Sequence, residues 1–512
     1  MKPTICLNMI VKNESAIIVR CLQKVKNLID AWCIVDTGST DNTIELIQKE
    51  LGHLPGEVIE RPWVNFGFNR NEALSLSRHW ADWVLLIDAD MIVNDLGFDS
   101  SMLDSCVHGY HVMQFNRSIS YYNFRLLNTS VKWKCTGVTH EFYSCEKQNP
   151  LIKKLDAIQI NDVGDGGAKS DKFERDIRLL LQGLEDEPGN LRYMFYLAQS
   201  YRDIGEFEKS IEWYKKRIEG GGWHEECWYS YYMISTCYIK LGEIKKAEEW
   251  ALRGFEYYPK RSEALYDLCK EFRVRGDHKK AYEYYRMGKP IVRPKDDVLF
   301  ISHDVYDFLF DYELTIFHFY LFPEDRIEGL RKSVEFMRMN PEHLSRVYLN
   351  LKFYLGDLSS HASCKGESES VMSEKSWPFL SREKVICSWS PLRVFDFENR
   401  KEVYCHSSPV FFDYFCDSSS VAVNYNGLKW FVVHSIAYES PRTYMHWLVA
   451  LQSDGKPVMH SLPFSFEGEK IEYCLSLNII DDKFEFQYST WDSSSKFLQI
   501  PIEYFGNKMI LC

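Results

Sequence analysis

The first 165 or so residues alternate short apolar runs with segments of helical periodicity. Apolar runs of strand length lie at residues 5–11, 31–35, 57–60 and 83–87. Apolar residues spaced three and four positions apart predict helices between these runs, over 17–28, around Ile44, Ile47 and Leu51, and over 71–79. Strands that alternate with helices are typical of a mostly parallel sheet with covered faces. We therefore expect a Rossmann-like α/β domain over residues 1–168.

From about residue 171 the pattern changes to pairs of helices. Gly205, Gly242 and Gly276 lie in similar settings and are 37 and 34 residues apart. A small residue lies seven positions before each glycine (Ala198, Ser235, Cys269) and another lies five positions after it (Ser210, Ala247, Ala281). This is close to the tetratricopeptide period of 34 residues, in which small residues let two helices approach. We expect a tetratricopeptide-like solenoid over 169–295 and further helices over 296–358.

The last third of the chain changes pattern again. Residues 356–377 are rich in Ser and Glu and predict a linker or a long exposed loop. Residues 378–512 predict a β-rich domain, with strands at 410–415, 429–435, 447–451 and 483–488. Aromatic residues are dense at 444–447 and 461–464, which fits either a packed β core or a carbohydrate-binding face.

Composition and charge exclude several classes of protein. A chain of 512 residues is too long for one core, so about three domains are expected. The net charge of −12 argues against nucleic-acid binding. The first apolar run is too short for a signal peptide, and the apolar stretch over 298–322 carries four acidic residues, so we expect no membrane span. The 15 cysteines form no Cys-x-x-Cys pair, which indicates reduced thiols and a cytoplasmic location.

Two acidic residues follow the fourth apolar run directly. Asp88 and Asp90 come at the carboxyl end of the strand predicted over 83–87, which is the edge where ligands bind in open α/β sheets. Two carboxylates one residue apart repel each other unless a positive charge lies between them, and a divalent cation with a preference for oxygen ligands supplies it. The alternative is that the two acids only cap a turn.

Three further motifs lie at or just beyond predicted strand ends. They are Asn8-Met9-Ile10-Val11-Lys12-Asn13-Glu14, the run Asp36 to Thr43, and Asn69-Arg70-Asn71. In order and spacing the four motifs resemble the inverting GT-A glycosyltransferases of family 2, and most of all the members that carry tetratricopeptide repeats after the catalytic domain. The resemblance covers about residues 1–290. This pairing of domains occurs in bacteria and in large DNA viruses.

The resemblance implies a metal-dependent inverting transfer of a sugar. The donor would be a nucleotide sugar, commonly a UDP-sugar, and the acceptor a hydroxyl of a glycan, a lipid or a protein. By family analogy Asp36 accepts a hydrogen bond from the base, Asp88 lies near the ribose, and Asp90 ligates Mg²⁺ or Mn²⁺. The alternative role of Asp36 is capping the next helix, for which Ser39 and Thr40 are better placed.

The remaining candidates lie around the predicted diphosphate. The resemblance points to Glu141 in Thr136-Gly137-Val138-Thr139-His140-Glu141 as the general base, with Asp104 as the alternative. It also makes His140 a second metal ligand or a diphosphate contact, unless that histidine is structural. Arg70 either contacts the diphosphate or pairs with an acid on a helix face. Lys169 and Lys172 follow a glycine-rich stretch, 161–167, which is either a loop that closes over the diphosphate or an interdomain linker.

Two other functions compete with this interpretation. The chain is alternatively a scaffold, in which an inactive transferase-like domain accompanies repeats that bind a protein partner. A nucleotidyltransferase would also use paired acids, but it would carry a glycine-rich loop after the first strand, and residues 11–14 contain no glycine.

Overall fold

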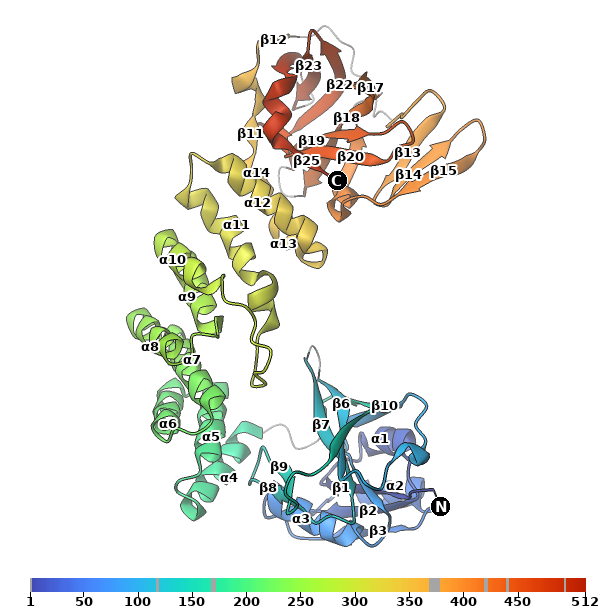
Figure 1. Ribbon diagram of the computed structural model, residues 1–512, viewed down its shortest axis with the longest axis vertical. Helices are drawn as coiled ribbons and strands as arrows, with labels where there is room; N and C mark the ends of the chain where they lie inside the picture. Colours follow the sequence, from blue (N-terminus) through green and yellow to red (C-terminus); the bar gives the residue numbers. More distant parts are fainter. Residues whose placement is uncertain are drawn as a thin grey trace. The chain divides into compact units, whose positions relative to one another are not determined.

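The computed structural model describes residues 2–116, 119–166, 172–367, 378–418, 422–438, 442–491 and 494–512. The chain divides into two compact units, residues 1–250 and 251–512. The first unit holds the α/β domain and the helices up to α7, the boundary lies within α8 (Ile244–Tyr257), and the second unit holds the later helices and the β-rich domain (Figure 1). The division falls inside the segment of helix pairs.

The α/β domain is built on an eight-stranded sheet with the order β3-β2-β1-β4-β7-β6-β10-β5. Its strands are β1 (Ile5–Val11), β2 (Ala31–Asp36), β3 (Gly56–Glu60), β4 (Trp83–Leu86), β5 (Met91–Asp95), β6 (Gly109–Asn116), β7 (Ile119–Asn128) and β10 (Ile152–Asp162). Strands β3, β2, β1 and β4 run parallel, and β7 and β5 run antiparallel to their neighbours. The expected mostly parallel α/β architecture is confirmed.

Three helices and a hairpin complete this domain. The helices are α1 (Ile18–Val25), α2 (Thr43–Leu51) and α3 (Phe66–Ser77), and the hairpin is formed by β8 (Trp133–Thr136) and β9 (Phe142–Cys145). Helix α3 begins five residues before the helix predicted over 71–79. The reason is a local cap, because the Asn65 side chain accepts the N–H of Phe68.

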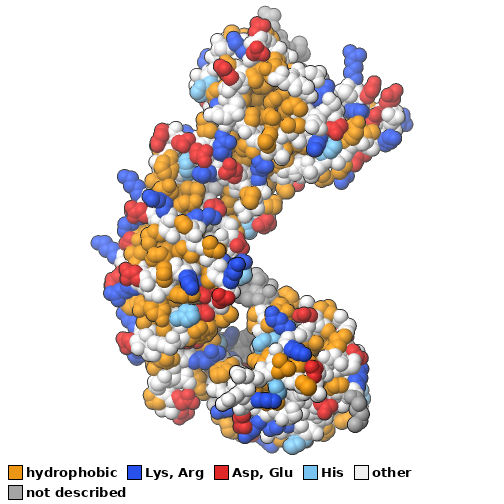
Figure 2. All heavy atoms as spheres, viewed as in Figure 1, with side chains coloured by type: hydrophobic (Ala, Val, Ile, Leu, Met, Phe, Trp, Pro, Cys, Tyr) orange, Lys and Arg blue, Asp and Glu red, His pale blue; other side chains and the backbone are white. Residues whose placement is uncertain are grey.

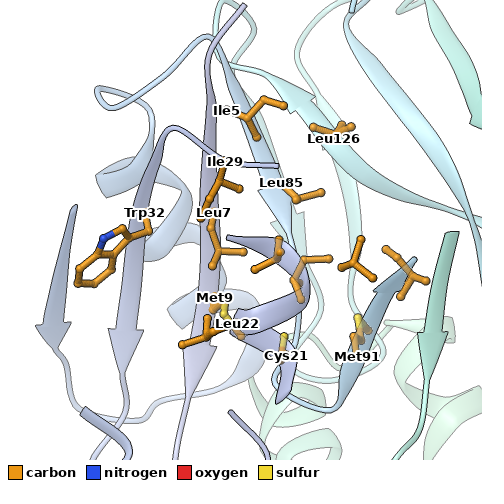
Figure 3. Packing of buried hydrophobic residues seen from close by; sticks show 14 of the residues in the cluster. Ile5, Leu7, Met9, Cys21, Leu22, Ile29, Trp32, Leu85, Met91 and Leu126 are labelled. Atoms are coloured by element: carbon orange, nitrogen blue, oxygen red, sulfur yellow. The ribbon is translucent and has the colours of Figure 1, made fainter. Parts of the chain in front are cut away.

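Strand β1 is buried on both faces of the sheet. Leu7 and Met9 pack into a hydrophobic core together with Leu85 of β4 (Figure 3). On the opposite face, Cys6 packs against Cys33 of β2 in a separate cluster. A strand buried on both sides needs apolar residues at consecutive positions, which is the pattern seen in its sequence.

The carboxyl ends of β1, β2 and β4 meet at one edge of the sheet. Val11, which ends β1, pairs with Asp36, which ends β2. Asn8 pairs with Leu86, the last residue of β4. The segments that follow these three strands therefore start from the same edge, and they carry three of the four sequence motifs.

Helix pairs follow the α/β domain. They are formed by α4 (Lys172–Asp186), α5 (Leu191–Asp203), α6 (Phe207–Glu219), α7 (His224–Lys240) and α8 (Ile244–Tyr257). Gly205 turns the chain between α5 and α6 at φ +83°. The Oγ of Ser210 donates to the Ala198 carbonyl at 2.8 Å, and the Oγ of Ser235 donates to the Ala247 carbonyl at 2.8 Å. Helices approach this closely only where both facing residues are small, so the expected helix pairing is confirmed.

The second unit continues with helices. They are α9 (Glu263–Val274), α10 (His278–Gly288), α11 (Phe310–Leu321), α12 (Arg326–Met339), α13 (Leu344–Tyr348) and α14 (Leu351–Tyr354). Gly276, at φ +79°, joins α9 to α10 at the place that the repeat pattern predicts.

The chain ends in a β-rich domain, as expected. Its strands are β11 (Gly356–Asp357), β12 (Cys364–Glu367), β13 (Lys384–Trp389), β14 (Leu392–Asp396), β15 (Lys401–His406), β16 (Phe415–Ser418), β17 (Val423–Tyr425), β18 (Leu428–Ala437), β19 (Thr443–Leu451), β20 (Pro457–Ser461), β21 (Phe464–Ser465), β22 (Glu472–Ile480), β23 (Lys483–Thr490), β24 (Ser494–Pro501) and β25 (Met509–Leu511). The long pair β18–β19 lies at the centre of the largest of its sheets.

Two predictions for this last third are wrong. Residues Val410–Tyr414 form a 3₁₀ helix rather than a strand, and the adjacent Phe411 and Phe412 are buried in the same hydrophobic core, whereas adjacent residues of a strand point to opposite faces. Residues 356–367 are not a linker, since β12 pairs with β24. The rest of that stretch, 368–377, lies outside the described residues.

The aromatic-rich stretches of the β domain belong to its interior. Trp447 is fully buried in one hydrophobic core, and Phe464 is buried in another. A packed core therefore accounts for these two residues, and neither offers a ring to a carbohydrate at the surface.

The surface and the thiols add three observations. In the part of the chain that is described, no helix is long and apolar enough to cross a membrane. All 14 cysteines whose side chains are described are free thiols. On the face drawn in Figure 2, basic and acidic side chains are interspersed along the described helices rather than gathered by sign.

Gly205→Ala tests the conformation of the turn between α5 and α6. Space around Gly205 is open, so the new methyl group meets no neighbour, but φ +83° is unfavourable for an L-residue. We expect the free energy of unfolding of the full chain to fall by about 1 kcal/mol in urea titrations followed by circular dichroism. Gly189→Ala is the matched control, because Gly189 has open space and no positive φ. Equal effects of both substitutions would contradict the explanation.

His460 predicts a pH dependence of stability in the β-rich domain. Its ring is fully buried, 5.2 Å from that of Phe411, and burial is the main cause that lowers its pKa to about 4. The unfolded chain, with an ordinary histidine pKa near 6.5, takes up a proton between pH 6.5 and 4 that the folded chain does not. Stability should therefore fall by about 2 kcal/mol from pH 7 to pH 5.

His460→Phe is expected to remove this part of the pH dependence, because phenylalanine fills the aromatic surroundings without titrating. Calorimetric melting of the full chain and the variant at pH 7 and pH 5 measures the difference. An identical pH dependence of both melting temperatures would overturn the assignment.

Candidate functional site

The acidic pair lies in a tight turn between β4 and β5. The N–H of Met91 donates to the Asp88 carbonyl at 3.0 Å and closes the turn. The N–H of Val163, just after β10, donates to the Asp90 carbonyl at 3.1 Å. Since β4 is buried along its whole length, the turn is held at the edge of the sheet where the parallel strands end.

The side chain of Arg70 on α3 lies between two carboxylates. Its Nη2 donates to Asp88 Oδ1 at 2.9 Å, and its Nε donates to Glu141 Oε1 at 2.6 Å. The three side chains are 14%, 26% and 16% exposed. Burial opposes the charge on Arg70, but the two carboxylates raise the pKa of the guanidinium well above its usual value. Arg70 thus bridges two loops and does not pair with an acid on a helix face.

Asp88 has a second cationic neighbour that the sequence does not suggest. Arg125 on β7 is buried, and its Nη1 lies 3.8 Å from Asp88 Oδ2. Burial alone would raise the pKa of Asp88, but Arg70 and Arg125 lower it below the usual carboxyl value. Asp88 is therefore charged at neutral pH.

A cleft at this edge consists of two adjoining pockets. The larger pocket, of about 410 Å³, is lined by Ile10, Val11, Lys12, Asn13, Glu14, Thr37, Trp63, Phe66, Arg175 and Arg178. The smaller pocket, of about 300 Å³, is lined by Ile10, Glu14, Phe66, Arg70, Asp88, Ala89, Asp90, Met91, Asp162, Gly166, Lys172 and Arg175. Four residues line both pockets, so the cleft is continuous.

Helix α4 contributes cations to this cleft. Lys172, Arg175 and Arg178 are spaced three residues apart, which brings them toward one side of the helix. Lys172 and Arg175 line the smaller pocket, and Arg175 and Arg178 line the larger one. Lys172 thus lies beside the acidic pair, whereas Lys169 lies outside the described residues.

Two carboxylates converge above Gly166 in the smaller pocket. A Cβ placed on Gly166 would lie 3.4 Å from Glu14 Oε1 and 3.6 Å from Asp90 Oδ2. Asp162, the last residue of β10, lines the same pocket. Carboxylate oxygens are the ligands that Mg²⁺ and Mn²⁺ prefer, so this donor set fits such an ion.

Asp36 is buried, lines neither pocket, and among the described residues has hydrogen-bond partners for only one of its two carboxylate oxygens. Its Oδ2 accepts the N–H groups of Gly38 and Ser39 at 2.9 and 2.8 Å. Its Oδ1 is buried without a hydrogen-bond partner in the described part of the chain. Thr37, the next residue, lines the larger pocket. A buried acceptor without a donor is costly, which makes Asp36 a candidate for contact with a ligand.

Ser39 and Thr40 do not cap the helix that follows, contrary to expectation. Helix α2 begins only at Thr43. The Oγ of Ser39 accepts the N–H of Asn13 at 2.8 Å, and the N–H of Thr40 donates to Asn13 Oδ1 at 2.7 Å. The two residues instead tie the loop after β2 to the loop after β1.

His140 is held by the helical segment. Its ring stacks on that of Tyr196 of α5, with centroids 4.0 Å apart and planes 4° apart. Burial, and after it two neighbouring cations, lower its pKa to about 4, so the ring is neutral at pH 7. His140 does not line the pocket that Asp90 lines. The structure therefore does not bring the expected second metal ligand to the acidic pair.

The other predicted residues fall into two groups. Four of them line the smaller pocket: Arg70, Asp88, Asp90 and Lys172. Glu141 lines neither pocket and reaches the site through Arg70. Asp104, the alternative base, also lines neither pocket, and its carboxylate accepts the N–H of Cys106 and the ammonium of Lys153.

The sequence suggests no role for several residues that line the cleft, namely Glu14, Trp63, Phe66, Asp162, Arg175 and Arg178, or for Arg125, which lies behind Asp88. The three-residue spacing that Arg175 and Arg178 share with Lys172 is a signal that was available. Arg125 has no such local signal, because its approach to Asp88 depends on the register of β7 against β4.

Known proteins resemble parts of this chain. Residues 6–147 match the model of the family described as "Glycosyl transferase family 2". The SPbeta prophage-derived glycosyltransferase SunS of Bacillus subtilis is 24% identical over 229 residues, which are 42% of this chain and 53% of SunS. The uncharacterized glycosyltransferase RP128 of Rickettsia prowazekii is 44% identical over 81 residues, 16% of this chain and 26% of that protein.

The TPR repeat-containing protein Synpcc7942_0270 of Synechococcus elongatus is 36% identical over 87 residues, 17% of this chain and 20% of that protein. The chain thus spans about half the length of SunS and about a quarter or less of the other two relatives. The chain thus resembles glycosyl transferase family 2 over residues 6–147, within the mostly parallel sheet domain, and continues in tetratricopeptide-like helix pairs.

Proposed function

We propose that the chain is a metal-dependent inverting glycosyltransferase that moves a sugar from a UDP-sugar to a hydroxyl of a glycan, a lipid or a protein. The observation that carries the proposal is the composition of the cleft. Acidic residues from the strand ends and cations from α4 line the same pocket, beside Asp88 and Asp90. Such a pocket suits a metal ion together with an anionic diphosphate.

The larger pocket is the proposed nucleoside site. Asp36 comes directly before Thr37, which lines this pocket, and its unsatisfied Oδ1 is a buried acceptor for which the imide N–H of uracil is a matching donor. Trp63 and Phe66 line the same pocket and offer apolar ring surface to a base. Arg175 lines both pockets and would contact the diphosphate that joins the two ends of the donor.

Asp90 is the proposed metal ligand, with Glu14 and Asp162 as the nearest further carboxylates in its pocket. A bound Mg²⁺ or Mn²⁺ supplies Lewis-acid neutralisation of the diphosphate as it leaves. Lys172 adds positive charge from the helix side. Asp88, held as a charged carboxylate by Arg70, is the proposed acceptor for a ribose hydroxyl.

Glu141 is the proposed general base, which takes the proton of the acceptor hydroxyl during attack on C1 of the sugar. Arg70 binds one of its oxygens and so fixes its orientation. The tetratricopeptide-like helices are a proposed surface for a protein partner or for an extended acceptor. The first test is the release of UDP or GDP from a panel of nucleotide sugars with Mn²⁺. Binding without any turnover would favour the scaffold alternative.

Asp90→Asn tests the metal assignment without relying on turnover. The substitution keeps the size of the side chain but removes the charge that a divalent cation needs. We expect the affinity for UDP in the presence of Mn²⁺ to fall at least about tenfold in isothermal titration calorimetry, with no change in EDTA. Glu45→Gln, an exposed acid on α2, is the control for the change in net charge. An unchanged Mn²⁺-dependent affinity would refute the role of Asp90.

Glu141→Gln separates proton transfer from the positioning of Arg70. Glutamine keeps an oxygen that accepts from Arg70, but it does not take up a proton. We expect kcat to fall by about 100-fold or more, with little change in the KM for the donor. Glu146→Gln, an exposed acid just after β9, serves as the control. Activity within a few fold of the parent chain would mean that Glu141 only orients Arg70.

A further inference from the structure

The loop that carries Glu141 is held from its other side by the first helices of the repeat segment. Val138 packs against the buried cluster that contains Leu180 of α4. The Oγ1 of Thr139 donates to Oδ1 of Asp176, a carboxylate on α4 that is 2% exposed. Burial raises the pKa of Asp176, and this hydrogen bond is one of the contacts that oppose the rise. Two consecutive loop residues are therefore fixed by α4.

Arg192 of α5 holds the residues on both sides of Glu141. Its Nε and Nη2 donate to the His140 carbonyl at 3.2 and 2.9 Å. Its guanidinium carbon lies 5.1 Å from the centre of the Phe142 ring and 4.9 Å from that of Tyr196. Because the preceding carbonyl and the following ring are both engaged, little freedom is left to the backbone of Glu141.

Two features of this contact are unfavourable when each is taken alone. His140 has φ +50°, in a region that side chains with a Cβ rarely adopt. Arg192 is the second residue of α5, where a cation opposes the helix dipole. Such features persist where neighbouring contacts determine them, and here the stack of His140 on Tyr196 and the two hydrogen bonds do so.

The contacts continue from the loop into the cleft. Glu141 accepts from Arg70, and Arg70 donates to Asp88 in the turn after β4. An unbroken series of contacts thus connects α5, through the His140 backbone, to the acidic pair. Every member of this series belongs to the first compact unit.

We propose that α4 and α5 position the general base, and that Arg192 is the positioning residue that acts through Glu141. This inference rests on the function proposed above. The repeat segment would then position Glu141 at the site, in addition to its proposed role as a surface for a protein partner. The module needed for transfer extends through the first helix pair, to Asp203 at least, and does not end near residue 168.

Arg192→Ala is the direct test. The substitution removes the contacts of Arg192 with the His140 carbonyl and the Phe142 ring, on both sides of Glu141. We therefore expect kcat to fall by about 10-fold to 100-fold while the KM for the donor stays the same. Hydrogen exchange of the segment 133–145 should become faster. In a chain that already carries Glu141→Gln, Arg192→Ala should cost no further activity, because no base remains to be positioned.

Arg202→Ala is the matched control, since Arg202 lies on the same helix and contacts Asp203 and Met233 instead of the loop. Additive losses in the double variant, or an equal loss of kcat from Arg202→Ala, would overturn the inference. Faster exchange without any loss of kcat would overturn it as well. If the parent chain turns over no donor, the proposed function fails, but exchange of segment 133–145 still tests the contact. Unchanged exchange in Arg192→Ala would then show that Arg192 does not hold the loop.

Discussion

The site depends on one guanidinium between two carboxylates. Asp88 and Glu141 lie in separate loops, and Arg70 is the residue that hydrogen-bonds to both. Only an arginine suits this position well, because its planar fork presents N–H groups in different directions, whereas the ammonium of a lysine is a compact point charge. With all three side chains largely buried, removal of the cation would leave two carboxylates poorly solvated near each other. The geometry of the turn after β4 and that of the loop before β9 are therefore coupled.

The charges of the cleft come from two different parts of the chain. The acids Glu14, Asp88 and Asp90 follow strands of the sheet, while the cations Lys172 and Arg175 belong to α4. Without the helix, the described lining of the smaller pocket would hold four carboxylates and Arg70 as its single cation, and it would repel an anionic ligand. Helix α4 supplies the opposite charge from the other wall. This division of charge explains why the helix belongs to the site although it lies beyond the matched family segment, 6–147.

The sequence predicts the parts of this structure that depend on local patterns. A strand buried on both faces must be apolar throughout, so the sequence pattern alone predicts β1 and β4. Asp88 then stands out as the first polar residue after the apolar run of β4. The helix pairs are visible because Gly205 and the small residues around it recur at a regular spacing. The 3₁₀ helix over Val410–Tyr414 has the composition of a strand, and what distinguishes it is that two adjacent phenylalanines are buried in the same core, which the sequence does not show. Sequence patterning does not show the approach of Arg125 to Asp88, which depends on strand register.

The direction in which the His140 side chain points is also not predictable from the sequence. The structure explains why histidine rather than glycine occupies this position. A residue at φ +50° would be least strained as glycine, yet glycine would have no ring to stack on Tyr196. With histidine at this position, the stack on Tyr196 offsets the strain of the positive φ. Because the ring is neutral at pH 7, it also adds no positive charge beside Arg192. The His140 ring thus contacts α5, while the side chain of Glu141, the next residue, accepts a hydrogen bond from Arg70. A sequence in which an imidazole and a carboxylate are adjacent suggests that they act at one site, but the backbone conformation assigns them to two different partners.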